Sequence, residues 1–249
     1  MIKKSKVAIT IDTDWVSDEV IEYTLALLLK YNAKATWFIT HDSNAIKRLF
    51  DCNDMFEIGI HPNFLSNSTQ GSTVSEVMSN LLSIHPEAKI MRTHSLYQSS
   101  LMFETILKKY PGIKADVSLF LPYEEHVRPH RYYAMSANKM NYITRIPYVW
   151  EDDYEMYLPK PNFKFDIGRF SGTGIKIFDF HPIHIALNSV TIDSYARLKS
   201  SSASGIPKLK LKDVFRFRQT KCAGVEDFLK GLLCDKKAQF VNIKEKTRI

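Results

Sequence analysis

The chain has 249 residues, of which 45% are hydrophobic and 24% are charged. This length can bury the core of a single α/β domain, and the composition argues against wholesale disorder. The formal net charge of +7 suits anionic partners. The three cysteines, Cys52, Cys222 and Cys234, are widely spaced and form neither a disulfide framework nor a Cys-x-x-Cys metal site.

The N-terminus lacks the pattern of a secretory signal. Lys3, Lys4 and Lys6 precede an apolar run, but this run ends at Asp12 and is too short for the core of a signal peptide. No apolar stretch approaches the roughly 20 residues that span a bilayer. We therefore expect a cytoplasmic protein with no transmembrane segment.

Apolar periodicity predicts strands and helices that alternate along the chain. Strands are expected at 7–11, 35–40, 55–60, 88–91, 113–117, 142–149, 175–180 and 239–243. Helices are expected at 18–31, 44–50, 74–82, 101–110 and 224–234, with an irregular segment at 119–138. A βα unit repeated six or seven times predicts an α/β fold with a parallel sheet, open or closed into a barrel.

The stretch 188–222 has no clear period. We expect it to form a long basic loop within a single domain that covers residues 1–249, and such a loop is either functional or disordered. Its basic run at 208–221 alternates charged and apolar residues, which predicts an exposed strand or hairpin. Nucleic-acid contact is the less favoured interpretation, and we expect no nucleic acid among the partners.

Reactive side chains collect just after the predicted strands. They are Asp12, Asp14, His41, His61, Arg92, His94, the acidic residues at 151–153, and His181. Active sites of (β/α) barrels are built from the loops at this end of the strands. The distribution therefore favours an active site over scattered structural histidines.

Asp12 and Asp14 are two residues apart at the end of the first strand, so their carboxylates face the same side. Two carboxylates this close suit one metal ligand and one general base. In the alternative interpretation the strand end is solvated, and Asp14 or Ser17 caps the next helix.

Carboxylate and imidazole ligands with an open position form hydrolytic zinc-type centres. We expect Asp14 and His61 to be the first two metal ligands and Asp12 to take a proton from the attacking water. Arg92 is expected to pair with Asp12, and His181 to protonate the leaving group, held by Asp179 or the aspartates at 152–153. A surface ion pair for Arg92 and a structural turn for His181 stay open as alternatives.

Four segments resemble, in order, the motifs of the NodB-homology polysaccharide deacetylases, carbohydrate esterase family four. They are 10–14 (Thr-Ile-Asp-Thr-Asp), 57–61 (Glu-Ile-Gly-Ile-His), 92–94 (Arg-Thr-His) and 180–182 (Phe-His-Pro). The chain looks most like an atypical branch associated with bacterial surface-polysaccharide and O-antigen gene clusters.

The resemblance implies a distorted (β/α) barrel of about seven parallel strands and a divalent metal. By position, Asp12 is similar to the family's base, Asp14 to its metal aspartate and His61 to its first metal histidine. Arg92 resembles the arginine that orients the base, and His181 the general acid.

Two departures from the family pattern stand out. The usual second motif is His-Ser/Thr-x-x-His, but Leu65 occupies the place of its second histidine and cannot bind a metal. We expect His94 to be the replacement ligand, with Asn63, Asn67 and His184 as weaker candidates. The two aspartates are also separated by Thr13 rather than adjacent, a spacing that some branches have.

The sequence therefore predicts a metal-dependent deacetylase that removes an acetyl group from an acetylated amino sugar or glycan precursor in surface-polysaccharide biosynthesis. Zinc is the expected metal, with cobalt, manganese, iron or nickel as alternatives. Leu65 motivates a second hypothesis, a non-catalytic carbohydrate-binding or assembly protein on a decayed deacetylase barrel. A third keeps the metal centre but acts on a non-sugar amide or a phosphoester.

Overall fold

The computed structural model describes residues 5–122, 124–136, 139–170, 172, 174, 176–202 and 205–247. Within them, one ten-stranded sheet has the order β6-β7-β5-β4-β3-β2-β1-β9-β8, and β10 pairs with β1. The strands are β1 (Ser5–Asp12), β2 (Ala35–Ile39), β3 (Phe56–Ile60), β4 (Ile90–Met91), β5 (Ala115–Phe120), β6 (His130–Ser136), β7 (Lys139–Tyr148), β8 (Trp150–Glu151), β9 (Lys176–Phe180) and β10 (Ala238–Phe240).

The sheet is parallel except where β6 runs antiparallel to β7. One continuous segment links its two sides, because β7 pairs with β5 and then passes through Val149 into β8, which pairs with β9. The amide of Val149 itself donates to the carbonyl of Ile177 at 3.0 Å. The predicted α/β fold with a mostly parallel sheet is therefore confirmed.

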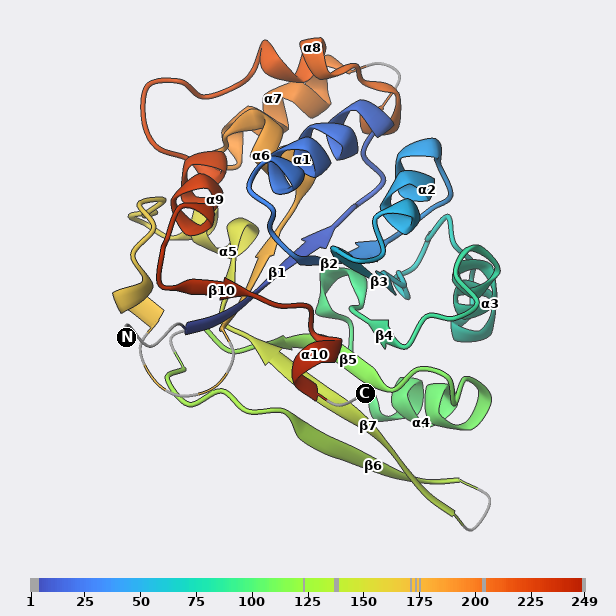
Figure 1. The fold of residues 1–249 in the computed structure, drawn as a ribbon. Helices are drawn as coiled ribbons and strands as arrows, with labels where there is room; N and C mark the ends of the chain where they lie inside the picture. The colour runs from blue at the N-terminus through green and yellow to red at the C-terminus, as the bar shows by residue number, and fades with distance from the viewer. Residues whose placement is uncertain are drawn as a thin grey trace.

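Most helices cover the outer side of this sheet, whereas the last one, at the C-terminus, lies at its inner face (Figure 1). The helices are α1 (Asp18–Lys30), α2 (Asn44–Asp51), α3 (Val74–Ile84), α4 (Ser100–Lys109), α5 (Asp152–Tyr157), α6 (Pro182–Leu187), α7 (Asp193–Ser201), α8 (Leu211–Phe215), α9 (Val225–Leu233) and α10 (Lys244–Thr247), with 3₁₀ turns η1 (His94–Leu96), η2 (Ile167–Phe170) and η3 (Ile206–Lys208). None of the helices described is long and apolar enough to cross a membrane.

Alternation along β1 explains how the core and the site are separated. Val7, Ile9 and Ile11 belong to the large apolar cluster beneath the helices, whereas Ala8 belongs to a separate cluster on the opposite, inner face. Because alternate residues of a strand share a face, Thr10 and Asp12 continue that inner face toward the C-terminal end of the strand. The inner face thus changes from apolar to polar along one strand.

The C-terminal segment covers the other end of the inner face. Val241 and Ile243 are buried in the inner apolar cluster, and the amide of Val241 donates to the carbonyl of Val7 at 3.0 Å. The amide of Lys244 then reaches the Glu57 carboxylate at 3.2 Å. With one end packed in this way, the polar groups gather at the C-terminal ends of the strands.

Two segments differ from their predicted structure. The segment expected to be irregular contains β6, which forms a long hairpin with β7 at one edge of the sheet, beside α4 (Figure 1). The prediction of a long loop at 188–222 is wrong for the described part of this stretch, because α7, η3 and α8 lie there. Ile175, the first residue of one predicted strand, lies outside the described residues.

The basic run at 208–221 is likewise neither a strand nor a hairpin. Its apolar members Leu209, Leu211 and Phe217 pack against the core beneath the helices. The period of two in the sequence therefore reflects partial burial in a short helix and its flanking turns, with the lysines and Arg216 exposed.

We predict that Phe228 on α9 is a main stabilising contact between the helices and the sheet. It is fully buried, and its ring stacks on Trp150 of β8 with a centroid distance of 4.0 Å. Phe228→Ala should lower the free energy of unfolding by about 3–5 kcal/mol through lost burial and a residual cavity. Phe215→Ala is the matched control, because Phe215 is 39% exposed. Equal losses in urea denaturation would show that α9 does not pack as described.

Candidate metal centre and active site

Three side chains from three different loops meet at the C-terminal ends of the strands. Asp14 follows β1, His61 follows β3 and His94 follows β4. Asp14 Oδ1 lies 3.1 Å from His61 Nε2 and 3.2 Å from His94 Nδ1, and the two imidazole nitrogens are 3.3 Å apart. The structure thus brings together the three residues that the sequence assigns to a metal.

The spacing of these three donor atoms fits a tetrahedral metal site. Zinc held at about 2.0–2.1 Å from each ligand places neighbouring donor atoms about 3.3–3.4 Å apart. A carboxylate with two imidazoles also leaves a fourth position for water or substrate, as in hydrolytic zinc centres. His61 Nδ1 is buried without a hydrogen-bond partner and lies 3.6 Å from Asp12 Oδ2. Asp12 therefore lies beside His61 without a hydrogen bond to it.

Backbone geometry concentrates strain beside the ligands. Asp14 and Trp15 have φ values of 40° and 54°, and Ser95 and Leu96 have values of 51° and 52°. Such left-handed conformations are costly for residues other than glycine and persist where their surroundings hold them. Around Asp14 the holding contacts come from Thr40, whose hydroxyl accepts from Trp15 N at 3.2 Å.

The loop after His61 directs Leu65 toward solvent. Leu65 is 40% exposed and lies outside the cluster, while Gln70 Nε2 donates to the carbonyls of Thr40 and His61 at 2.9 and 3.1 Å. Gln70 therefore holds this loop against β2. Asn63, a weaker candidate for the third ligand, uses its side-chain oxygen to accept from Leu65 N.

The other two weaker candidates also lie apart from the cluster. Asn67 is exposed. His184 is buried in α6, where Nε2 faces Asp153 Oδ1 at 2.9 Å and Nδ1 lies 3.1 Å from Ser189 Oγ. Among the candidates for the third position, His94 is the one whose nitrogen reaches Asp14 and His61.

Asp12 is held from the other side by Arg92. Arg92 Nη1 donates to Asp12 Oδ1 at 3.1 Å and to Thr10 Oγ1 at 2.9 Å, and it also contacts Asp179 Oδ1. Burial raises the pKa of Asp12 well above its usual range, and the Arg92 charge opposes this shift. Arg92 is thus an internal cation rather than a surface ion-pair partner.

The guanidinium of Arg92 is fully enclosed. It stacks over the rings of Phe38 and Tyr148, with its carbon 4.8 and 4.4 Å from their centroids, and Nε donates to the carbonyl of Val117 at 3.1 Å. Burial lowers the pKa of Arg92, but the nearby Asp12 and Asp179 outweigh it and raise the pKa. The group therefore stays charged in the interior.

His181 faces the cluster from β9. Its Nδ1 lies 2.7 Å from Asp152 Oδ1, its backbone amide donates to Asp152 Oδ2 at 2.7 Å, and Nε2 lies 3.6 Å from Asp14 Oδ2. Burial lowers the pKa of His181, but Asp152 and Asp153 raise it well above its usual value. Of the partners expected from the sequence, Asp152 holds His181, whereas Asp179 belongs to Arg92.

Two further groups of donor atoms in the described chain include His181. One joins it to Asp12 and Asp179, and the other joins it to Glu151 and Asp153. In the first, both acids already face Arg92. In the second, Glu151 receives a hydrogen bond from the Tyr148 hydroxyl, and burial raises the pKa of Glu151 to about 8. The set formed by Asp14, His61 and His94 remains the best fit to a metal.

Comparison with known families agrees with this geometry. The sequence matches the model of the WbmS-like polysaccharide deacetylases over residues 9–199. The chain belongs to this family.

Solved structures place the fold in the same group. The chain is similar to WbmS of Bordetella bronchiseptica, a candidate polysaccharide deacetylase involved in O-antigen biosynthesis, with 28% identity over 93% of this chain and 90% of that chain and a TM-score of 0.75. Its fold is also similar to that of the Bc1960 peptidoglycan N-acetylglucosamine deacetylase, with 14% identity over 100% of this chain and 90% of that chain and a TM-score of 0.50. A search of curated proteins found no match.

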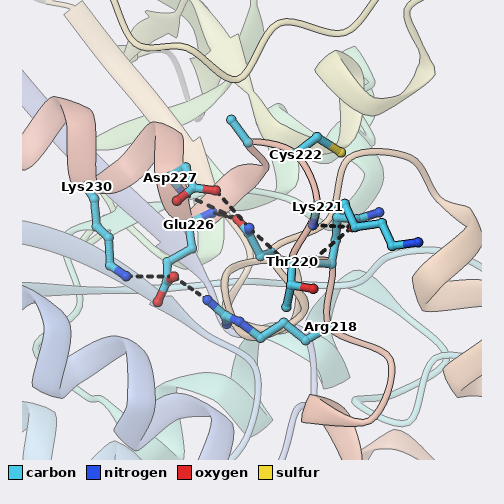
Figure 2. A pocket seen from close by; sticks show the side chains of 10 residues that line it. Arg218, Thr220, Lys221, Cys222, Glu226, Asp227 and Lys230 are labelled. Carbon is cyan, nitrogen blue, oxygen red and sulfur yellow. Dashed lines mark hydrogen bonds and ion pairs between the residues drawn. The ribbon is translucent and has the colours of Figure 1, made fainter.

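A surface hollow elsewhere on this deacetylase fold is separate from the metal cluster. It is lined by Asn188, residues 218–223, Glu226, Asp227 and Lys230 (Figure 2). Its charges are largely paired internally, because Glu226 binds both Arg218 and Lys230. The hollow therefore offers no compelling ligand site.

Several contacts of the site are not evident from the sequence. The contact between Thr10 and Asp179 could have been found, since each residue precedes a predicted site residue by two positions and so shares its face of the strand. The same rule does not predict the contacts of Gln70 and His41, because neither residue lies within a strand. His41, which the sequence groups with the site, contacts Thr40 Oγ1 at 2.8 Å and belongs to none of the candidate metal-ligand groups found among the described residues.

We predict that metal binding depends on His94 and not on the exposed Leu65. His94→Ala removes one of three converging donor atoms and should reduce the zinc retained per chain well below one, as measured by elemental analysis after dialysis. Leu65→Ala should retain the zinc content of the unaltered protein. Full zinc retention in the His94 variant would contradict the assignment of this residue.

Proposed function

We propose that the protein is a metal-dependent deacetylase that acts on an acetylated amino sugar or glycan precursor of bacterial surface-polysaccharide biosynthesis. The observation that carries the proposal is the meeting of Asp14, His61 and His94 between two further groups, Asp12 with Arg92 and His181 with Asp152. Membership in the WbmS-like family supports the reaction class, and the similarity to WbmS supports the O-antigen context.

Asp14, His61 and His94 would hold the metal, for which zinc is the first candidate because two imidazoles and a carboxylate suit it. When bound, the ion supplies Lewis acidity toward the acetyl carbonyl and the attacking water. A cytoplasmic location is part of the proposal, and the three free cysteines fit a reducing compartment.

Asp12 would act as the general base. Its carboxylate lies beside the metal ligands, 3.6 Å from His61 Nδ1, and burial favours its neutral form. A base must be ionised before it accepts a proton from water, and Arg92 favours that form through a charged contact at 3.1 Å. Arg92 would thus aim Asp12 and favour its anionic form against the effect of burial.

His181 would act as the general acid. Asp152 holds Nδ1, which leaves Nε2 on the side of Asp14 and available to give a proton to the departing amine nitrogen. The aspartate also favours the imidazolium, the form that has a proton to donate. Base and acid would therefore both act beside the three proposed metal ligands, with donor atoms of Asp12 and His181 within 4.8 Å of each other.

The alternative of a decayed barrel that only binds carbohydrate rests on Leu65. His94, from another loop, lies where it could supply the third donor, and Asp12 and His181 lie beside it as the proposed base and acid. These observations favour the enzyme over the non-catalytic alternative.

We predict that Asp12→Asn abolishes acetate release but leaves metal binding largely intact, because Asp12 is not one of the three donors. Loss of a general base should lower kcat by about 10²–10⁴-fold. Acetate release can be measured on free, nucleotide-linked and oligomeric N-acetylhexosamines, with zinc content determined in parallel. Asp54→Asn, at an exposed position, is the matched control. Activity of Asp12→Asn equal to that of the control would refute the role of Asp12.

We also predict that Asp152→Asn moves the alkaline limb of the pH–rate profile to lower pH. Asp152 raises the pKa of His181, so its charge keeps the imidazolium protonated to higher pH. Without that charge, the acid form is lost earlier as the pH rises, and kcat should also fall. The profile is measured alongside that of Asp54→Asn, and an alkaline limb that does not move would show that Asp152 does not tune His181.

A further inference from the structure

The backbone that carries His94 needs supporting contacts that a metal-binding histidine of the usual motif does not need. In the His-Ser/Thr-x-x-His pattern both histidines lie on one loop, so the local backbone sets the distance between them. Here His61 follows β3 and His94 follows β4, and the β4 strand is only two residues long. The position of His94 must therefore be set by contacts with neighbouring strands.

Successive backbone amides anchor this loop to both neighbours. Arg92 N and His94 N donate to the carbonyls of Ile60 and Pro62, at 3.1 and 2.9 Å, on the side of β3. Between them, Thr93 N donates to the side chain of Ser118 on β5, with a distance of 2.8 Å. A side-chain hydroxyl thus takes the place that a backbone carbonyl of β5 would have in a regular parallel ladder.

Ser118 can do this because β5 is irregular at that point. The register between β5 and β7 shifts between Asp116 and Leu119, so Ser118 lies within a bulge. Bulges next to active sites redirect side chains. The buried Ser118 hydroxyl donates to Asp116 Oδ1 at 2.5 Å, which leaves its lone pair for Thr93 N.

The same network also reaches the far side of His94. Asp116 Oδ2 accepts from Arg145 Nε at 2.8 Å, and Arg145 Nη2 contacts Gln98 Oε1. Gln98 Nε2 then donates to the carbonyl of Leu96 at 3.2 Å and to that of Ser118 at 2.7 Å. Residues 93 and 96, on either side of His94, are therefore tied to one connected set of side chains.

We propose that Ser118, Asp116, Arg145 and Gln98 form a positioning network that fixes the third metal ligand. It acts on the backbone that carries His94 and not on the imidazole. Because Ser95 and Leu96 are in left-handed conformations, the loop would relax once either tie is lost. Asp116, Ser118 and Arg145 are all buried, so they act through His94 and do not touch substrate.

The inference rests on the proposed metal centre, and it is tested on the full chain with zinc and cobalt as probes. Ser118→Ala removes the acceptor of Thr93 N and should weaken zinc binding about 10–100-fold, the usual effect of losing an outer partner of a metal ligand. Zinc affinity is measured by competition with a chromogenic chelator. The visible spectrum of the cobalt-loaded protein should also change, since it reports ligand geometry.

Two matched variants separate positioning from general destabilisation. Ser43→Ala also removes a serine hydroxyl that accepts from a backbone amide, in this case Ile46 N in α2. Ser43 is not a member of the proposed positioning network. Ser43→Ala should lower thermal stability and leave zinc affinity and the cobalt spectrum unchanged. Ser118→Thr keeps the hydroxyl and should restore both readouts.

Gln98→Glu provides a second test that does not disturb the buried groups, because Gln98 is exposed. It keeps an oxygen for Arg145 but places the other oxygen against the carbonyls of Leu96 and Ser118. Zinc affinity should fall relative to Gln239→Glu, an exposed control on β10. If Ser118→Ala fails to fold, this comparison decides alone.

The possible failures are distinguishable. Unchanged zinc affinity and an unchanged cobalt spectrum in folded Ser118→Ala and Gln98→Glu would overturn the positioning network alone. If the unaltered protein and Asp14→Ala bound zinc equally, the metal centre would be refuted, and the network with it.

Discussion

The arrangement depends on one buried cation. Arg92 lies on the inner face of the sheet between Phe38 and Tyr148, and it joins acids from two other strands, Asp12 of β1 and Asp179 of β9. An uncompensated charge in this position is costly, and removing one partner from a buried ion pair typically destabilises a protein by about 3–5 kcal/mol. The same contacts that satisfy Arg92 therefore fix the register of the central strands and the orientation of Asp12.

The three proposed metal ligands, in contrast, are supported separately. Asp14 is held through its neighbours by Thr40, His61 by Gln70, and His94 by the network that begins at Ser118. Dividing the ligands among three loops removes the need for a second histidine near His61. It also requires more ordered polar contacts, because no single backbone segment sets the distances among the donor atoms.

Much of this organisation follows from the strand-end rule alone. Asp12, Asp14, His61, Arg92, His94 and His181 come directly after apolar runs, and parallel strands bring their C-terminal ends to one edge. The partner of His181 could not be chosen in advance, because Asp152 and Asp179 both lie near it and the register of β8 and β9 decides between them. Ser118 gave no signal either, since its role depends on a bulge that the local sequence does not reveal.

The basic run at 208–221 shows a different limit. Its alternating apolar residues have the period of a strand, but they lie in turns and in the short α8, partly buried against the large cluster. Periodicity over so few residues cannot separate a strand from a short helix whose orientation is set by tertiary contacts.

The central claim is that three donor atoms from separate loops share one ion, and anomalous diffraction tests it most directly. In crystals grown with zinc, data collected on both sides of the zinc absorption edge should give one strong peak about 2.0–2.1 Å from Asp14, His61 Nε2 and His94 Nδ1. A zinc peak bound by other residues, with these three side chains apart, would contradict the account.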